Sequence, residues 1–181
     1  MKKGFTLAEV LITMGVIGVV AALTIPSLST QYQKRVLTTQ LQKAYAELSQ
    51  AGAMVIANEM TSYFHQSRAV RNRNFIGPYV KTGGSGSFAS NYALLSDKNT
   101  QYNFLGDISN RRDCGSMLSG AVVCVDDNGK GILDVNGAKG PNLIGRDAFT
   151  IWFDRGGKVT SDYSPSLKYI MSEDWDLDAA L

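Results

Sequence analysis

Hydrophobic residues dominate the N-terminal part of the chain. Lys2 and Lys3 come first, Glu9 follows, and no charged residue occurs from position 10 to position 33. As an α-helix, residues 5–25 would extend ~32 Å, close to the ~30 Å thickness of the hydrocarbon core of a bilayer. The pattern therefore predicts an apolar helix that is long enough to span a membrane.

A second helical pattern follows, with apolar residues three or four positions apart and charged residues among the positions between them. The apolar positions are Leu37, Leu41, Ala44, Tyr45, Leu48, Ala51 and Val55. This spacing predicts an amphipathic helix that packs on a globular partner and ends near residues 58–61. Pro26 lies between the two patterns. Because proline lacks a backbone N–H and crowds the preceding turn, we expect Pro26 to kink or locally open the helix.

Short apolar or alternating runs in the C-terminal half predict a small antiparallel sheet. Turn-forming pairs such as Asn128-Gly129 and Asn136-Gly137 separate these runs. The predicted strands cover residues 121–125, 132–135, 148–153 and 158–163. The pattern by itself indicates an α+β fold.

Length and composition restrict the possible functions. A chain of 181 residues holds one domain and an appendage, and 44% hydrophobic with 19% charged residues is enough apolar material for a core. The net charge of +2 gives no argument for a nucleic-acid partner. Two Cys and the single His65 are too few for an ordinary zinc site, and His65 has no evident partner for catalysis. We therefore expect neither an enzyme nor nucleic-acid binding.

Two ordinary interpretations of the N-terminal segment leave Glu9 unexplained. A secretory signal peptide cut near residues 20–22 would carry an acid at the mouth of its apolar region, and the helical pattern continues past the cut. A plain single-pass anchor accounts for the length, but a carboxylate deep in lipid costs ~2.5 to 3.5 kcal/mol.

A third interpretation comes from the run Lys-Lys-Gly-Phe-Thr-Leu-Ala-Glu-Val-Leu-Ile at residues 2–12. It resembles the N-terminus of type IV pilins and type II secretion pseudopilins. The resemblance implies that a prepilin peptidase cuts after Gly4, that the new terminal Phe5 is N-methylated, and that Glu9 acts in assembly. Pro26 falls where many pilins carry a helix-kinking proline.

The same resemblance implies a domain plan and a location. Residues 1–4 would be the leader peptide, 5–25 the transmembrane and filament-core helix, 26–60 an amphipathic helix and 61–181 a globular domain. The expected fold is a long kinked N-terminal helix packed on a small antiparallel sheet. The precursor would cross the inner membrane once, with its C-terminal domain periplasmic or extracellular, and would then enter a filament.

The resemblance also implies partners: other copies of the chain, the prepilin peptidase and methyltransferase, and an inner-membrane assembly platform. The filament could be either a type IV pilus or a secretion pseudopilus. A membrane-tethered binding domain that never polymerises is the alternative from another class.

Glu9 has two possible roles. Thr6-Leu7-Ala8-Glu9 matches a capping box, in which the Thr hydroxyl and the Glu carboxylate satisfy free N–H groups at a helix start. In a filament, Glu9 could instead neutralise the terminal amine of Phe5 on a neighbouring subunit. That pairing would favour one axial register between subunits.

Cys114 and Cys124 close an eleven-residue loop. Because the N-terminal segment places this domain outside the cytoplasm, we expect a disulfide worth on the order of 2 to 3 kcal/mol. Two free thiols are the alternative.

Two acidic regions remain. Some pseudopilins bind Ca2+, and Asp126, Asn128, Asp134 and Asn136 are candidate ligands here, although turn formation also explains such residues. No other cofactor is expected. The tail with Glu173, Asp174, Asp176 and Asp178 is expected to fray, unless Trp175 and Leu177 anchor it or it docks on the basic stretch 68–81 of an adjoining subunit.

Overall fold

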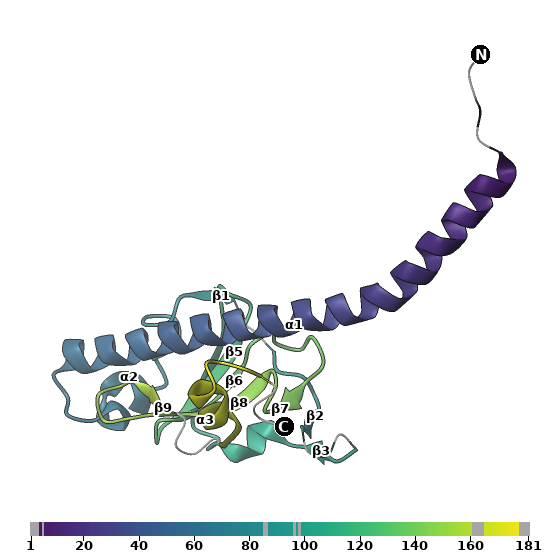
Figure 1. Cartoon of the computed structure of the whole chain (residues 1–181). Coiled ribbons are helices and arrows are strands. Elements are labelled where there is room, and N and C mark those ends of the chain that lie inside the picture. Colours follow the sequence, from purple (N-terminus) through teal and green to yellow (C-terminus); the bar gives the residue numbers. More distant parts are fainter. Residues whose placement is uncertain are drawn as a thin grey trace. The chain divides into compact units, whose positions relative to one another are not determined.

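The computed structural model describes residues 4, 6–84, 87–95, 97, 99–160 and 165–177 (Figure 1). The helices are α1 (Leu7–Glu59), η1 (Phe64–Gln66), α2 (Arg68–Arg71), η2 (Phe104–Asp107) and α3 (Pro165–Ser172). The strands are β1 (Thr82–Gly84), β2 (Tyr92–Leu94), β3 (Gln101–Tyr102), β4 (Arg112–Met117), β5 (Val122–Asp126), β6 (Lys130–Asp134), β7 (Leu143–Ile144), β8 (Ala148–Phe153) and β9 (Val159–Thr160). The chain divides into two compact units, residues 1–36 and 37–181.

The first unit contains the apolar part of α1. The helix continues through Pro26, and hydroxyl groups nearby bond to backbone carbonyls: Thr24 Oγ1 donates to Val20 O and Thr30 Oγ1 to Pro26 O, both at 3.0 Å. Such back-bonding is common where Ser and Thr lie inside a helix. The kink at Pro26 stays a prediction.

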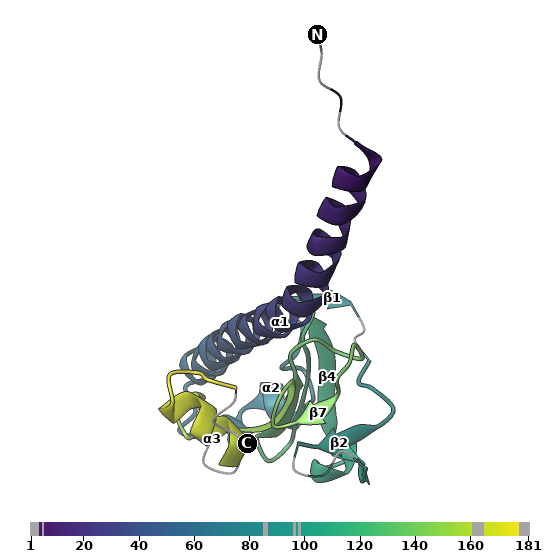
Figure 2. The same ribbon diagram turned by 45° about the vertical axis from the view of Figure 1, so that its right-hand side comes forward.

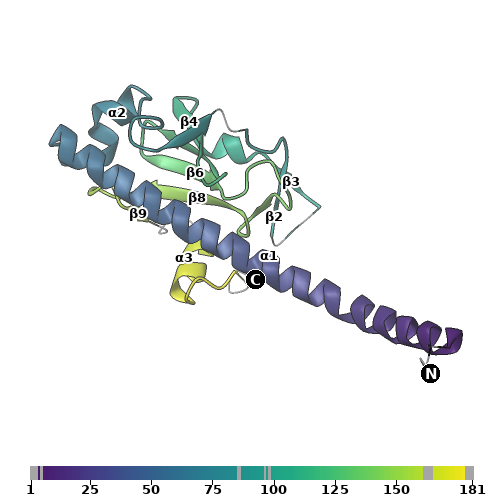
Figure 3. The same cartoon turned by 90° about the horizontal axis from the view of Figure 1, so that it is seen from above.

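The amphipathic part of α1 lies in the second unit and is confirmed. Six of the seven predicted apolar positions are buried, namely Leu37, Leu41, Ala44, Leu48, Ala51 and Val55, and Tyr45 is half-buried. The helix ends at Glu59, as expected from the sequence. Figure 3 shows this stretch of α1 lying across the sheet.

The two faces of the sheet bury different side chains because neighbouring residues in a strand point to opposite sides. Val123, Leu133 and Phe149 join α1 in the main core, while Cys124 and Ile132 join Tyr92 and Ile108 in a smaller cluster. Both faces are therefore covered, which explains why β5 is apolar at every position but its last.

The helix-on-sheet architecture is confirmed, but the sheet is mixed. Among the described strands the order is β1-β4-β5-β6-β8-β7-β2-β3, with β9 pairing β8. Most pairs are antiparallel, whereas β7 runs parallel to both β2 and β8. The sequence predicted an antiparallel sheet and missed the parallel β7, because a two-residue strand has no hydrophobic period and its direction is set by a tight turn held by Asp147.

The predicted strand positions hold closely in the centre of the sheet. β8 has the predicted bounds, and β5 and β6 lie within two residues of theirs. β9 covers Val159–Thr160, and the rest of the predicted strand, residues 161–163, lies outside the described residues. The structure adds β4, which carries Arg112, Asp113 and Gly115 and therefore has no apolar alternation that the sequence could reveal.

The segment that follows α3 folds back on α1. The Trp175 ring packs edge-on against Tyr45 with 5.4 Å between centroids, and the carbonyl of Trp175 accepts from Thr38 Oγ1 at 3.4 Å. Leu177 is buried, as are Leu167 and Ile170 of α3. Figure 2 shows α3 close to α1 at the edge of the second unit. Up to Leu177 the tail is therefore anchored rather than frayed, and Asp178 lies outside the described residues.

Candidate assembly site

The start of α1 carries the residues of the predicted processing site. Gly4 is exposed, and a Cβ built on it would meet nothing within 4 Å. Open backbone of this kind can enter the cleft of a protease. Phe5, the predicted methylation site, lies outside the described residues, so cleavage after Gly4 and methylation of Phe5 stay predictions.

Thr6 and Glu9 form the predicted capping box. The Thr6 backbone N–H donates to Glu9 Oε2 at 2.7 Å, and the Thr6 hydroxyl donates to the same oxygen at 2.9 Å. The Glu9 N–H donates back to Thr6 Oγ1 at 3.3 Å. Two free N–H groups at the helix start are thereby satisfied. In the single chain Glu9 therefore bonds to its own helix, and a role between subunits stays a prediction.

The apolar side chains of the first part of α1, residues 7–28, point outward on all sides and are almost entirely exposed. The exposed fraction is 80% for Leu7, 67% for Ile12 and 75% for Leu23. The helix is long and apolar enough to cross a membrane, by length and composition. Monomeric soluble proteins rarely expose apolar surface on this scale, so this surface fits a helix that is covered by lipid or by other apolar helices.

The calcium candidates divide between the two ends of the β5–β6 hairpin. Asp126 ends β5 beside Asn128, whereas Asp134 pairs with Val122 at the other end, near Asn136. The four residues therefore do not form one ligand set. Across the described residues no group of three or more His, Cys, Asp or Glu is placed to hold a metal ion.

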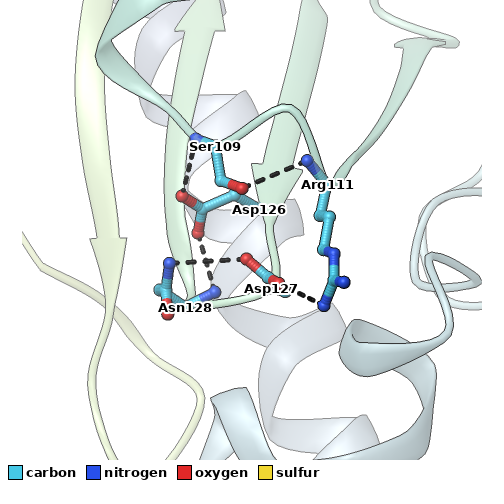
Figure 4. A network of polar contacts seen from close by, with 5 residues as sticks. All are labelled: Ser109, Arg111, Asp126, Asp127 and Asn128. Atoms are coloured by element: carbon cyan, nitrogen blue, oxygen red, sulfur yellow. Dashed lines mark hydrogen bonds and ion pairs between the residues drawn. The ribbon is translucent and has the colours of Figure 1, made fainter.

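Asp126 organises the turn between β5 and β6 (Figure 4). Its Oδ1 accepts from the N–H groups of Asn128 at 2.9 Å and Lys130 at 3.0 Å, and its Oδ2 accepts from the Ser109 N–H at 3.1 Å. Arg111 Nη1 lies 3.9 Å from Asp127 Oδ2 on the exposed side of the turn. These bonds explain Asp126 as a turn-forming residue without a metal.

Asp134 and Asp147 are fully buried. Asp134 accepts a hydrogen bond from the Tyr92 hydroxyl and one from the Asn136 N–H, and Asp147 accepts from the N–H groups of Asn142 and Leu143. Burial raises the pKa of Asp134 to about 6 and also raises the pKa of Asp147. Burial, together with the Asp134 bond, raises the pKa of Tyr92 as well.

This buried polar group was not predicted from the sequence. Asp147 stands directly before the apolar run 148–153 with no motif around it, and Tyr92 belongs to a strand that no pattern indicated. The available signal was an Asp at the end of one apolar run and another directly before the next, at positions 134 and 147.

The predicted disulfide is present. Cys114 on β4 lies directly opposite Cys124 on β5, and the two sulfur atoms are bonded. Cys114 is exposed, whereas Cys124 lies in the smaller core cluster. The bridge therefore ties the surface of the hairpin to the interior of the sheet.

The four cationic side chains of the basic stretch at residues 68–81 are solvent-exposed. Arg68 and Arg71 lie on α2, and Arg73 and Lys81 follow in the loop before and at β1. Glu59 at the end of α1 accepts from the backbone N–H groups of Arg68 and Ala69, which fixes α2 beside the helix.

Comparison with known proteins gives results in two regions of the chain. A family model described as the prokaryotic N-terminal methylation motif matches residues 1–25. Two proteins named fimbrial protein, both from Pseudomonas aeruginosa, are 28% and 27% identical over 146 residues, which is 77% of this chain and 88% of each relative. No solved structure matches the chain.

The motif lies on the residues whose geometry is described above: the open Gly4 and the Thr6–Glu9 cap at the start of an uncovered apolar helix. The fimbrial relatives extend the similarity over most of the chain, and a helix-on-sheet domain with a disulfide follows the motif. The chain therefore carries the prokaryotic N-terminal methylation motif at residues 1–25 and is similar over most of its length to type IV pilin-like proteins named fimbrial protein.

Proposed function

We propose that the protein is a structural subunit of a type IV pilus or a type II secretion filament and catalyses no reaction itself. The precursor crosses the inner membrane once, with residues 37–181 on the periplasmic or extracellular side. A prepilin peptidase cuts it between Gly4 and Phe5, and Phe5 is then N-methylated. The mature subunit enters the filament through an inner-membrane assembly platform.

One observation carries the proposal: the apolar part of α1 is uncovered, while residues 37–181 have a closed core of their own. The core of that unit comes from the buried face of α1, the sheet and α3, and it takes nothing from residues 7–28. The apolar helix is therefore free to pack against lipid or against the same helix of other copies.

Moving the helix from lipid to a filament core changes little hydrophobic free energy, because both surroundings are apolar. Close helix packing and the neutralisation of charge must supply the preference for the filament. Gly15 and Gly18 leave open space beside the helix backbone, which permits close approach of a neighbouring helix. Glu9 would exchange its bonds to Thr6 for the positively charged amine of Phe5 on the next subunit, and this exchange would select one register.

The experiment that tests the proposal replaces Glu9 by Ala in the full chain. We expect normal cleavage and membrane location but a loss of filaments, measured as sheared surface material by immunoblot, together with the mature N-terminal mass. Glu47→Ala is the matched control, since Glu47 is a half-buried glutamate of the same helix that lies outside its apolar part.

Two results would contradict the proposal. Absence of filaments from the wild type, together with unchanged location and binding of Glu9→Ala, would indicate a membrane-tethered binding domain that never polymerises. A mature protein that begins at Met1 or at Leu23 would contradict the assignment of the cleavage site.

A further inference from the structure

Two exposed groups of opposite charge lie at different heights along α1 in the unit of residues 37–181. Arg68, Arg71 and Arg73, here called the basic pole, lie on and just after α2, and all three are exposed. Glu173 and Asp174, here called the acidic pole, follow α3 and are also exposed. Asp176 has an interaction of its own and is not counted.

Each pole is fixed to a different part of the same helix. Glu59 holds the backbone of Arg68 and Ala69 at the C-terminal end of α1. Thr38 bonds to the carbonyl of Trp175, directly after the acidic pole. Thr38 and Glu59 are almost six helical turns apart, roughly 30 Å at 1.5 Å per residue. Figures 1 and 3 show α2 beside the end of α1 and α3 further back along it.

Groups of opposite charge nearby weaken the electrostatic potential of each pole only in part. Glu59 uses its carboxylate on backbone N–H groups, and Asp113 lowers the local potential near Arg73 while accepting from Phe75 and Ile76. Lys168 on α3 is an exposed cation on the element that precedes the acidic pole. No ion pair between the poles and these groups is seen within the described part of the chain.

We propose that the basic pole of one subunit contacts the acidic pole of the next copy along the filament. A contact between two different surfaces of the same chain is heterologous, and such contacts produce open helical filaments when they do not close into a ring. Because this inference rests on the proposed function, the α1 helices of successive copies are parallel. An axial displacement then brings the basic pole, near Glu59 of α1 in one copy, next to the acidic pole, near Thr38 of α1 in another copy.

A second copy fits the basic pole better than a nucleic acid does. The chain itself supplies the complementary charges, and removal of residues 1–4 would leave 16 basic and 16 acidic side chains, so the mature chain has separated charges with no overall basic excess. Binding to nucleic acid depends on net positive charge over a large surface.

The test reverses each pole separately in the full chain. Arg68→Glu with Arg71→Glu makes both poles acidic, and Glu173→Lys with Asp174→Lys makes both poles basic. We expect each double variant to give about tenfold fewer sheared filaments than the wild type, because poles of like charge then face each other. A tenfold change corresponds to about 1.4 kcal/mol. Lys139→Glu with Lys158→Glu is the matched control, since both lysines are exposed and belong to neither pole.

Rescue separates a lost contact from a lost fold. The chain with all four pole substitutions should assemble again, and so should a mixture of the two double variants expressed together, because opposite poles then meet. Misfolding would not be rescued in either case, and thermal unfolding of each variant provides the independent check.

The outcomes distinguish this inference from the proposed function. Absence of filaments from the wild type would overturn the proposed function itself. Wild-type assembly with unchanged yield in both double variants, or failure of both rescues, would overturn the contact between poles alone. A basic-pole variant that assembles normally but binds less duplex DNA would assign the pole to nucleic acid and overturn the contact between copies.

Discussion

At the scale of single residues, the polar side chains of the domain act mainly by closing turns and by linking strands. Asp126 and Asp147 each accept two or three backbone N–H groups, and Asp134 joins β6 to Tyr92 on β2. At Asp126 and Asp134 the sequence allowed turn formation as the alternative to calcium binding, and both side chains accept backbone N–H groups in turns. It could not predict that Asp134 and Asp147 become fully buried, because burial depends on the segments that cover them.

The raised pKa of Asp134 predicts an unusual dependence of stability on pH. A folded-state pKa of about 6 lies above the ordinary value of 3.8, so this group contributes stability that is present below pH 3.8 and is lost as pH rises through about 6. The loss is about 3 kcal/mol, at 1.36 kcal/mol for each unit of pKa difference. Asp134→Asn should therefore reduce the decline between pH 4 and pH 7 that the wild type shows and leave the part that the raised pKa of Asp147 contributes.

The measurement is urea unfolding of the wild type and the variant at a series of pH values, and the difference between the two profiles isolates Asp134. Asp127→Asn is the control, because Asp127 is only partly buried and lies at the other end of the β5–β6 hairpin from Asp134. Parallel profiles for the wild type and Asp134→Asn would contradict the assigned cause.

At the scale of elements, the close contact between α1 and the turn before β9 depends on two glycines. A Cβ on Gly52 would lie 1.9 Å from the carbonyl oxygen of Gly157, and Gly157 has φ +78. The sequence predicted the buried face of α1 but not this requirement, because a glycine within a helical pattern reads simply as a weak helix former.

Gly52→Ala should therefore destabilise the domain by roughly 2 to 4 kcal/mol, since backbone on both sides would have to move. Gly156→Ala in the same turn is the control: its Cβ would meet only Asp154 Oδ1 at 3.5 Å. Thermal or urea unfolding of both variants checks the prediction, and equal midpoints for the two variants would refute the close-contact argument.

The disulfide joins two strands whose ladder already holds them in register. Replacing both Cys114 and Cys124 by Ala should lower the free energy of unfolding by about 2 to 3 kcal/mol through loop-closure entropy, together with a small packing loss at Cys124. The five-residue pairing of β4 with β5 should keep the hairpin folded.

Chemical unfolding of the double variant measures the change in the free energy of unfolding, and far-UV circular dichroism shows whether the strands remain folded. A variant that never folds would show that the bridge, and not the ladder, holds β4 in place.

At the scale of the whole molecule, the chain combines one unit with an uncovered apolar surface and one unit with a core of its own. Residues 7–28 expose their apolar side chains, whereas residues 37–181 bury theirs in a core of their own. This division matches a subunit that is stored in a membrane and used in a filament.

A chain that begins at Ser29 should therefore be soluble without detergent and unfold within about 4 °C of the detergent-solubilised full chain. The expected reason is that none of the residues removed belongs to the main core. A truncated chain that aggregates or unfolds far earlier would show that the domain needs the N-terminal unit.

The N-terminal motif, the apolar helix, the buried face of α1 and the central strands followed from sequence alone, because each depends on local order or on a regular period. The Cys114–Cys124 disulfide was the favoured of two alternatives, because of the short loop and the location that the N-terminal segment implies. Only the tertiary structure decided the parallel placement of β7, the Gly52–Gly157 contact, the buried Asp134–Tyr92 pair and the anchoring of Trp175. These features join segments far apart in the chain, and no local pattern records which distant surface a residue will meet.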